Sequence, residues 1–367
     1  MALPDLSATW NGRGPLAVGL LPLALLYRGA LALRALPWQL GWRRPAPLPV
    51  PVVVVGNVVA GGAGKTPTVI TLVQHLRAAG WRPGVVSRGH GRTDRAAVRV
   101  CDDATGDPAR LGDEPALIVR RTGAPLAVGH ERPAAVRALL QRHPTVDIVV
   151  SDDGLQHWAL ARDLSIIVFD ERDVGNGWLL PAGPLREPWP APVWGGAPAL
   201  VLRTGKPSAP SRPHPYPEYR ATRALADAAL PVPAPDEPPL RASQPLADWA
   251  AARTPLGALA GIARPNAFFA MLRARGLTLV HTLALPDHAP AAALTAALQA
   301  AATTAGAPRH WLCTEKDAVK LHGQPLPDGV TLWQVPLVLT PEPAWYAAID
   351  RYLQGWRRTR AADHGAL

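Results

Sequence analysis

Cysteine and lysine are both scarce in this chain of 367 residues. The two cysteines, Cys101 and Cys313, exclude a disulfide scaffold and fit a reducing compartment. Only four of the 38 basic residues are lysines, so the other 34 are arginines. A lysine at any one position is therefore informative.

The sequence also lacks the marks of several nucleic-acid-binding classes, namely zinc-finger spacing, an aromatic RNA-binding run and a compact Lys/Arg block. No repeat of fixed period is visible. The net charge of +10 therefore indicates an anionic substrate or a membrane surface, and we expect neither nucleic acid nor an obligate protein as a partner. Since 48% of the residues are hydrophobic and 18% are charged, disorder over the whole chain is excluded.

The apolar run near the N-terminus is short. Residues 15–27 are thirteen uncharged residues followed by Arg28, whereas a spanning helix needs about 20. A signal peptide is not indicated, because Asp5 precedes the run and no clean small-residue cleavage site follows it. The alternatives are a core helix and an amphipathic helix lying on the membrane surface over residues 1–45. Clustered arginines and tryptophans favour the surface helix: Arg13, Arg28, Arg34, Arg43, Arg44, Trp10, Trp38 and Trp42.

Beyond residue 45, β-rich runs alternate with helical patterns, which predicts two α/β/α lobes with mainly parallel sheets. The first lobe is expected to resemble a P-loop NTPase and to cover residues 46–206, with its last strand at Ala199–Leu202. Ten prolines between Pro207 and Leu240 predict an extended linker over residues 207–245. A second α/β lobe is expected over 246–356, closed by a helix at Pro343–Leu353, and a frayed tail over 357–367.

Residues 56–67 read GNVVAGGAGKTP and lie between an apolar run and an expected helix, which is the context of a Walker A loop. Glycines let backbone N–H groups point at phosphate oxygens, Lys65 reaches the β- and γ-phosphates, and the Thr66 hydroxyl can bind Mg²⁺. The strict pattern has glycine where Val59 stands, so a glycine-rich turn is the alternative. The scarcity of lysine favours a nucleotide site. The expected phosphate-binding residues are Val59, Ala60, Gly61, Gly62, Ala63, Gly64, Lys65 and Thr66.

Two acidic pairs accompany this loop. Asp152 ends an apolar strand and is the candidate second Mg²⁺ ligand, with Asp153 beside it for water or substrate; turn chemistry is the alternative. Asp113 and Glu114 stand at an expected helix start, where they serve either as a general base and its neighbour or as helix-capping acids.

Basic and imidazole side chains add two further candidates. Arg88 and His90 lie in the loop SRGHGR, which suits phosphate or sugar contacts or is simply solvated. Asp287 and His288 follow an apolar strand of the second lobe and can orient one another as an acid–imidazole pair.

These motifs together resemble the tetraacyldisaccharide 4′-kinase family, the lipid A 4′-kinases of Gram-negative bacteria. The matching segments occur in the family's order: 56–67, SRGHGR (87–92), GDEP (112–115), DDGLQH (152–157), LLPAGPLRE (179–187), GIARP (261–265), PDH (286–288) and TEKDAVKL (314–321). The family shares the departure at Val59. Many relatives carry a second histidine after PDH; here Ala289 follows, which leaves His288.

The resemblance implies transfer of the ATP γ-phosphate to the 4′-hydroxyl of a tetraacylated glucosamine disaccharide 1-phosphate at the cytoplasmic face of the inner membrane. It implies that Lys65 and Thr66 bind ATP and Mg²⁺, and that Asp113 is the base, supported by His288. The metal and phosphate region would be lined by Glu114, Asp152, Asp153, Gln156 and His157.

Other functions remain open on the residues alone. A P-loop kinase or ligase with a soluble substrate would need no lipid, and a membrane-surface nucleotide-binding regulator would need no base. A GTPase is disfavoured, because in TEKD (314–317) the lysine stands one place late for guanine recognition.

Overall fold

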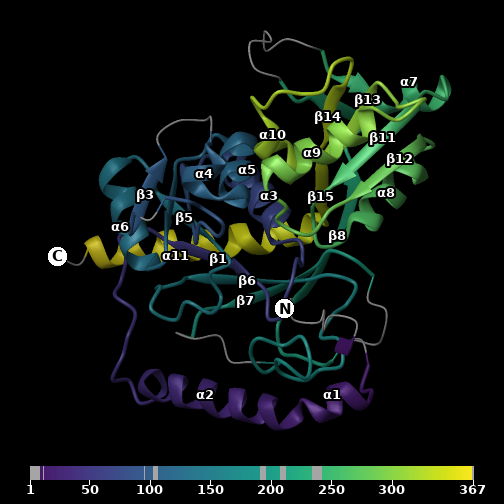
Figure 1. Cartoon of the computed structure of the whole chain (residues 1–367). Coiled ribbons are helices and arrows are strands. Elements are labelled where there is room, and N and C mark those ends of the chain that lie inside the picture. The colour runs from purple at the N-terminus through teal and green to yellow at the C-terminus, as the bar shows by residue number, and fades with distance from the viewer. Residues whose placement is uncertain are drawn as a thin grey trace.

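The chain folds into two α/β lobes and a separate pair of N-terminal helices (Figure 1). The computed structural model describes residues 9–365 except 11, 95, 102–105, 191–195, 207–211 and 234–241, and from residue 359 onward it describes the backbone alone. The prediction of two lobes with mainly parallel sheets is confirmed.

The first lobe is built on a sheet whose central strands are short apolar runs buried on both faces, as in parallel sheets covered by helices. In the described part of the chain the strand order is β15-β8-β7-β6-β1-β5-β2-β4-β3. The strands from the first half are β1 (Val52–Gly56), β2 (Pro83–Ser87), β3 (Val98–Cys101), β4 (Leu126–Gly129), β5 (Ile148–Asp152), β6 (Leu164–Phe169) and β7 (Ala199–Arg203). The helices are α3 (Lys65–Ala78), α4 (Pro108–Leu111), α5 (Asp113–Thr122) and α6 (Arg132–Arg142).

The expected extended linker is wrong in part, because the Pro-rich stretch contains strands. β8 (Glu218–Leu225) pairs in parallel with β7 and antiparallel with β15 (Leu337–Pro341), so two strands extend the first sheet beyond Ala199–Arg203. The prolines flank β8, whose own sequence, EYRATRAL, contains none and keeps every N–H available for pairing. Residues 207–211 and 234–241 of the expected linker lie outside the description.

The second lobe has its own sheet, in the order β10-β9-β14-β13-β11-β12 over the described residues. Its strands are β9 (Ala228–Pro231), β10 (Gln244–Pro245), β11 (Pro255–Ala260), β12 (Thr278–Ala284), β13 (His310–Thr314) and β14 (Thr331–Val335). Its helices are α7 (Leu246–Ala251), α8 (Pro265–Ala274), α9 (Ala291–Ala302) and α10 (Glu315–Leu321).

The end of the chain returns to the first lobe, so the expected domain boundary at 356 and the frayed tail are wrong. Helix α11 runs from Pro343 to Gly365, and its Trp345, Ile349 and Leu353 are buried in the core of the first lobe. The helix continues past the expected end at Leu353. In this continuation, the guanidinium of Arg357 lies over the ring of Trp81, 3.5 Å from its centroid. Residues 366–367 of the expected tail lie outside the described residues.

The N-terminal helices α1 (Pro15–Gly19) and α2 (Leu21–Gln39) lie along one side of the first lobe (Figure 1). Only the small side chains of Ala17, Ala24 and Ala35 are buried in them. Most large apolar side chains of this segment are exposed, whereas Leu20, Leu21, Leu31 and Trp38 are half-buried. The exposed ones are Leu16, Val18, Leu23, Leu25, Leu26, Leu33, Leu36, Leu40 and Trp42. The alternative of a core helix is therefore wrong.

None of the helices in the described residues has the length and apolar character needed to cross a membrane.

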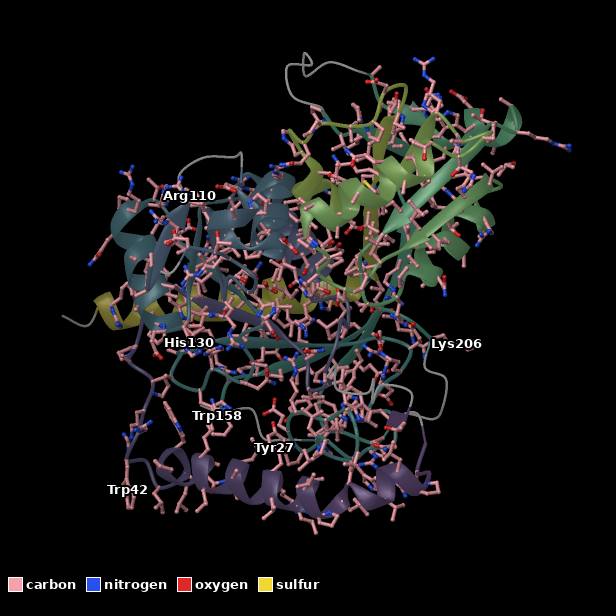
Figure 2. All side chains as sticks on the ribbon, in the orientation of Figure 1. Tyr27, Trp42, Arg110, His130, Trp158 and Lys206 are labelled. Atoms are coloured by element: carbon pink, nitrogen blue, oxygen red, sulfur yellow. The ribbon has the colours of Figure 1, made fainter. Side chains whose placement is uncertain are left out.

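Polar side chains, rather than apolar packing, attach α2 to the first lobe. The Tyr27 hydroxyl donates a 2.7 Å hydrogen bond to the carbonyl oxygen of Arg186, and Arg34 donates to that of Gln156 at 2.9 Å. The Arg34 guanidinium also lies 4.6 Å from the ring centroid of Trp158. Figure 2 shows Tyr27 and Trp158 between α2 and the lobe. Arg34, one of the arginines that favour a surface helix, is thus bound to the first lobe.

Candidate active site at the carboxyl edge of the first sheet

The predicted site residues of the first lobe follow the carboxyl ends of parallel strands. The glycine loop comes after β1, Arg88 after β2, and Asp152 ends β5. Adjacent strands of an open α/β sheet place their carboxyl ends at one edge, where ligands bind. The pairing of Val55 in β1 with Asp152 in β5 fixes the glycine loop beside the acidic pair.

The glycine loop is anchored at one end and open at the other. The Ala60 N–H donates to the Pro184 carbonyl oxygen at 2.7 Å, and Val59 is buried and pairs with Leu185. These two residues therefore hold the loop in place, which explains why an apolar side chain replaces the usual glycine at position 59. Gly64, with φ at +85°, turns the chain into α3 in the left-handed conformation that glycine adopts without strain.

Lys65 opens α3 and extends into the site. Its side chain is buried, with Nζ 3.1 Å from the Asn57 Oδ1 and 3.6 Å from the Asp153 Oδ1. Thr66 is half-buried in the first turn of the same helix. The lysine is thus held by two polar groups at the mouth of the loop, where an incoming anion can replace them.

Asp152 and Asp153 have opposite electrostatic surroundings. Asp152 is buried, and its Oδ2 accepts a 2.9 Å hydrogen bond from Ser87. Burial first, and then the nearby Glu114 and Asp153 carboxylates, raise the pKa of Asp152 to about 7. Burial also raises the pKa of Asp153, but Lys65 and Arg186 outweigh it and the net direction is downward. An additional positive charge next to Asp152 would stabilise its ionised form.

Asp113 faces the second lobe. Its Oδ2 lies 3.1 Å from Lys320 Nζ and 3.4 Å from His288 Nδ1. The His288 ring is in turn 5.5 Å from that of His90 in an edge-on arrangement. Gly112 is required before Asp113, because a Cβ at φ +91° would stand 2.4 Å from the His90 carbonyl oxygen. The predicted pair of Asp113 and His288 is therefore assembled across the two lobes, and the Asp113 carboxylate points to Lys320 and His288.

Glu114 is bound by a lysine that sequence reasoning did not assign to the site. Lys316 Nζ lies 3.4 Å from Glu114 Oε1, 3.3 Å from Asp287 Oδ1 and 3.2 Å from His288 Nε2. Lys320 also donates to the Ala289 carbonyl oxygen at 3.0 Å. Position 289 thus contributes its backbone, and the TEKDAVKL segment supplies two lysines to the site.

A buried arginine, Arg132, was also missed. It is completely buried at the start of α6, and only its Nη1 has a partner among the described residues, the Gly129 carbonyl oxygen at 2.5 Å. Burial lowers the pKa of Arg132 to about 10. Burial, then Arg132 and Arg88, lower the pKa of His157 to about 4, so its imidazole is neutral near pH 7. The sequence did contain a signal for Arg132, because this residue closely follows the β4 run, whose carboxyl end lies at the same sheet edge.

Gln156 and Arg88 have different surroundings from each other. Gln156 Nε2 donates to the Asn57 carbonyl oxygen at 3.0 Å and to Glu187 Oε1 at 2.7 Å, which ties the DGLQH loop to the glycine loop. Arg88 is exposed on the loop after β2. The first residue therefore supports the loop, and the second is accessible to a ligand.

The fold and this sheet edge define an α/β protein with a glycine-rich loop between β1 and α3, an acidic pair and a carboxylate–imidazole pair. A family model described as tetraacyldisaccharide-1-P 4′-kinase matches residues 16–354, and the chain belongs to this family.

Close relatives carry the corresponding name. The tetraacyldisaccharide 4′-kinase of Polaromonas sp. (strain JS666) is 49% identical over 359 residues, covering 97% of this chain and 98% of that protein. The tetraacyldisaccharide 4′-kinase of Delftia acidovorans is 47% identical, with 98% of each chain covered. A crystal structure of LpxK from Aquifex aeolicus, described as an "apo" form in complex with ATP, has a TM-score of 0.72 at 24% identity and covers 92% of this chain and 99% of that one. This last likeness supports the fold.

Proposed function

We propose that this chain transfers the γ-phosphate of ATP to the 4′-hydroxyl of a tetraacylated glucosamine disaccharide 1-phosphate, a step of lipid A biosynthesis. The observation that carries the proposal is the approach of Asp113 to His288 and Lys320 at the sheet edge where Lys65 ends the glycine loop. Family membership fixes the reaction class, and the geometry supplies groups for each part of it.

The glycine loop is suited to the triphosphate. The N–H groups of residues 61–66 and the start of α3 provide donors and positive potential for the phosphate oxygens. Lys65 exchanges Asn57 and Asp153 for the β- and γ-phosphates and neutralises charge that moves toward ADP in the transition state. Val59 and Ala60 keep the loop in this shape, so the proposed phosphate-binding residues are 61–66.

Asp152 and Thr66 fit Mg²⁺. The buried Asp152 Oδ1 accepts no hydrogen bond from any described residue, which leaves it free for a cation. No group of three His, Cys, Asp or Glu side chains that could hold a metal ion occurs in the described part of the chain. The donor set of Asp152 and Thr66, with a single carboxylate, suits Mg²⁺, which takes one or two carboxylates and completes its shell with water and substrate phosphates. When bound, Mg²⁺ would neutralise phosphate charge, and Glu114, whose carboxylate acts on the pKa of Asp152, would hold a water ligand.

Asp113 is placed to take the proton of the acceptor. In the transfer, the 4′-oxygen forms a bond to the γ-phosphorus, the bond from that phosphorus to the β–γ bridging oxygen breaks, and ADP leaves. The hydroxyl proton passes to Asp113, which His288 and Lys320 hold in place. His90, whose ring lies edge-on to that of His288, is exposed, and so is Arg88 two positions earlier. The Arg132 nitrogens that bind no described residue favour an anionic group of the acceptor.

The exposed apolar side chains of α1 and α2 support a peripheral position on the cytoplasmic leaflet of the inner membrane. The segment also carries exposed Arg28, Arg43 and Arg44 for anionic head groups. Tyr27 and Arg34 connect α2 to the loops that carry Arg186 and Gln156. A lipid acceptor would thus reach the site from the surface on which the protein rests.

Replacing both Leu25 and Leu26 by glutamate is expected to lower binding to phosphatidylglycerol-containing vesicles by at least about 10-fold, since burying one leucine side chain stabilises binding by about 1.5–3 kcal/mol. Both side chains are exposed, at 63% and 71%, so the fold should be retained. Vesicle co-sedimentation measures the change. Val280→Glu, at an exposed position of the second lobe, is the control; equal binding by all three proteins would contradict the membrane position.

The proposed reaction is tested with [γ-³²P]ATP and a lipid A precursor disaccharide 1-phosphate in detergent micelles, with water as the only acceptor in a parallel sample. We expect label on the disaccharide at the 4′ position. Label released only as inorganic phosphate, or transferred only to a soluble acceptor, would contradict the proposal.

A further inference from the structure

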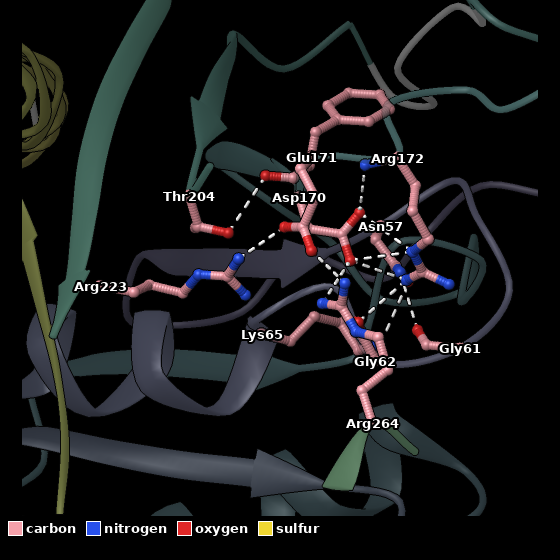
Figure 3. A network of polar contacts seen from close by, with 11 residues as sticks. Asn57, Gly61, Gly62, Lys65, Asp170, Glu171, Arg172, Thr204, Arg223 and Arg264 are labelled. Carbon is pink, nitrogen blue, oxygen red and sulfur yellow. Dashed lines mark hydrogen bonds and ion pairs between the residues drawn. The ribbon is translucent and has the colours of Figure 1, made fainter. Parts of the chain in front are cut away.

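Three arginines from three parts of the fold meet two adjacent carboxylates beside the glycine loop (Figure 3). Asp170 and Glu171 directly follow β6, and Arg172 belongs to the same loop. Arg223 comes from β8, and Arg264 stands at the start of α8 in the second lobe. The reaction described above uses none of these five side chains.

A continuous set of contacts leads from the second lobe to the phosphate loop. Arg264 Nη2 lies 3.3 Å from the Asp170 Oδ2, and Asp170 is completely buried. Asp170 also accepts hydrogen bonds from Arg172 Nε at 3.0 and 3.1 Å. Arg172 Nη2 in turn donates to the Gly62 carbonyl oxygen at 2.9 Å. A displacement of Arg264 is therefore transmitted to the loop through two charged side chains.

Glu171 strengthens the same connection. It forms an ion pair with Arg264 Nη1 and a second with Arg223 Nη2 at 2.5 Å. Burial raises the pKa of Glu171, but the backbone N–H and the two arginines outweigh it and hold this pKa at about 2. The carboxylate thus stays ionised at physiological pH.

The two lobes are joined by charged contacts on both sides of the glycine loop. On one side, beyond β5, Asp113 meets Lys320 and His288. On the other, after β6, Asp170 and Glu171 meet Arg264. Strand β1, which leads into the loop, lies between β5 and β6 in the sheet. The second contact therefore limits rotation of the second lobe about the first.

We propose that Arg264 is a positioning residue, which fixes the second lobe against the glycine loop through Asp170 and Arg172 so that His288 and Lys320 meet Asp113 beside the γ-phosphate. This role rests on the proposed kinase reaction. Ion pairs exposed to this extent add little to folding, since the Arg264 side chain is 38% exposed, so its effect should be on orientation and rate. A misplacement of about 1 Å between reacting groups is enough to cost up to about 100-fold in rate.

The test compares Arg264→Gln with Arg264→Lys and with Arg273→Gln, a control nine positions later on the exposed side of α8. In Arg264→Gln, kcat for transfer is expected to fall between about 10- and 100-fold, with KM for ATP changed less than about 3-fold because the glycine loop keeps Arg172. Arg264→Lys, which can pair with one carboxylate, should recover part of kcat. Small-angle X-ray scattering should show a larger radius of gyration for Arg264→Gln.

A kcat for Arg264→Gln equal to those of the wild type and of Arg273→Gln would overturn the proposal. So would a loss that appears only as a lowered melting temperature, or one confined to KM for ATP. Failure of the kinase reaction itself is distinguishable, because the wild-type protein would then show no transfer, while the scattering difference would still report on the contact.

Discussion

Lys65→Ala is expected to lower phosphate transfer by at least about 10²–10³-fold, the effect of removing one preorganised charged donor from a transition state. The lysine is buried and directed into the site by Asn57 and Asp153, so its ammonium group is in place before the nucleotide arrives. Transfer of ³²P from ATP to the lipid acceptor under single-turnover conditions measures the loss. Binding of ATP should also weaken, because the β- and γ-phosphates lose their cation.

Lys206→Ala is the matched control, since this lysine is exposed three residues after β7. It should leave the rate unchanged. If Lys65→Ala transferred phosphate as fast as the control, the glycine loop would have no part in the reaction.

Asp113→Asn is expected to reduce kcat by about 10²–10⁴-fold, the usual contribution of a general base. The amide keeps the shape of the side chain and its position near Lys320 and His288, but it cannot take the hydroxyl proton. ATP binding, measured by calorimetry, should stay within about 2-fold of the wild type, because the residue lies outside the glycine loop.

Asp328→Asn, an exposed position of the second lobe, serves as the control for this substitution. A full rate for Asp113→Asn with intact ATP binding would exclude base catalysis by this residue. That result would favour the alternative of a nucleotide-binding regulator.

Local sequence signals predicted that the glycine loop lies between a buried strand and a helix, which the structure confirms. The apolar run of β1, the glycines and the scarce lysine indicated the loop, because these features are neighbours in the sequence. Strands β4, β6 and β14 begin and end where their apolar runs do, since fully buried parallel strands leave little choice of boundary. The position of Asp113 next to His288 is different, because it depends on how two lobes meet.

The missed residues act through the tertiary structure. Lys316 and Lys320 stand on a short helix of the second lobe, and only the meeting of the lobes brings them to Glu114 and Asp113. Arg132 looks like an ordinary helix-start arginine until its complete burial is known. Strand β8 was hidden by its flanking prolines, because composition averages over the eight residues that pair. Burial and pairing over long sequence separations cannot be read from local patterns.

The exposed leucines of α2 also show what a sequence alone leaves open. An apolar run of this length fits a core helix or a surface helix equally well, and the difference lies in whether another element covers it. Here the side of α2 that faces the lobe carries the buried Ala24 and Ala35 and the hydrogen-bonded Tyr27. Five leucines of α2 are exposed: Leu23, Leu25, Leu26, Leu33 and Leu36.

The most direct test of the account is a crystal structure of the chain with Mg²⁺ and a non-hydrolysable ATP analogue. In that structure the γ-phosphate is expected within hydrogen-bond distance of Lys65 Nζ, with Mg²⁺ bound by Thr66 and Asp152. Asp113 should face the γ-phosphate across the space for an acceptor hydroxyl. A nucleotide bound elsewhere, with Lys65 still paired to Asn57 and Asp153, would contradict it.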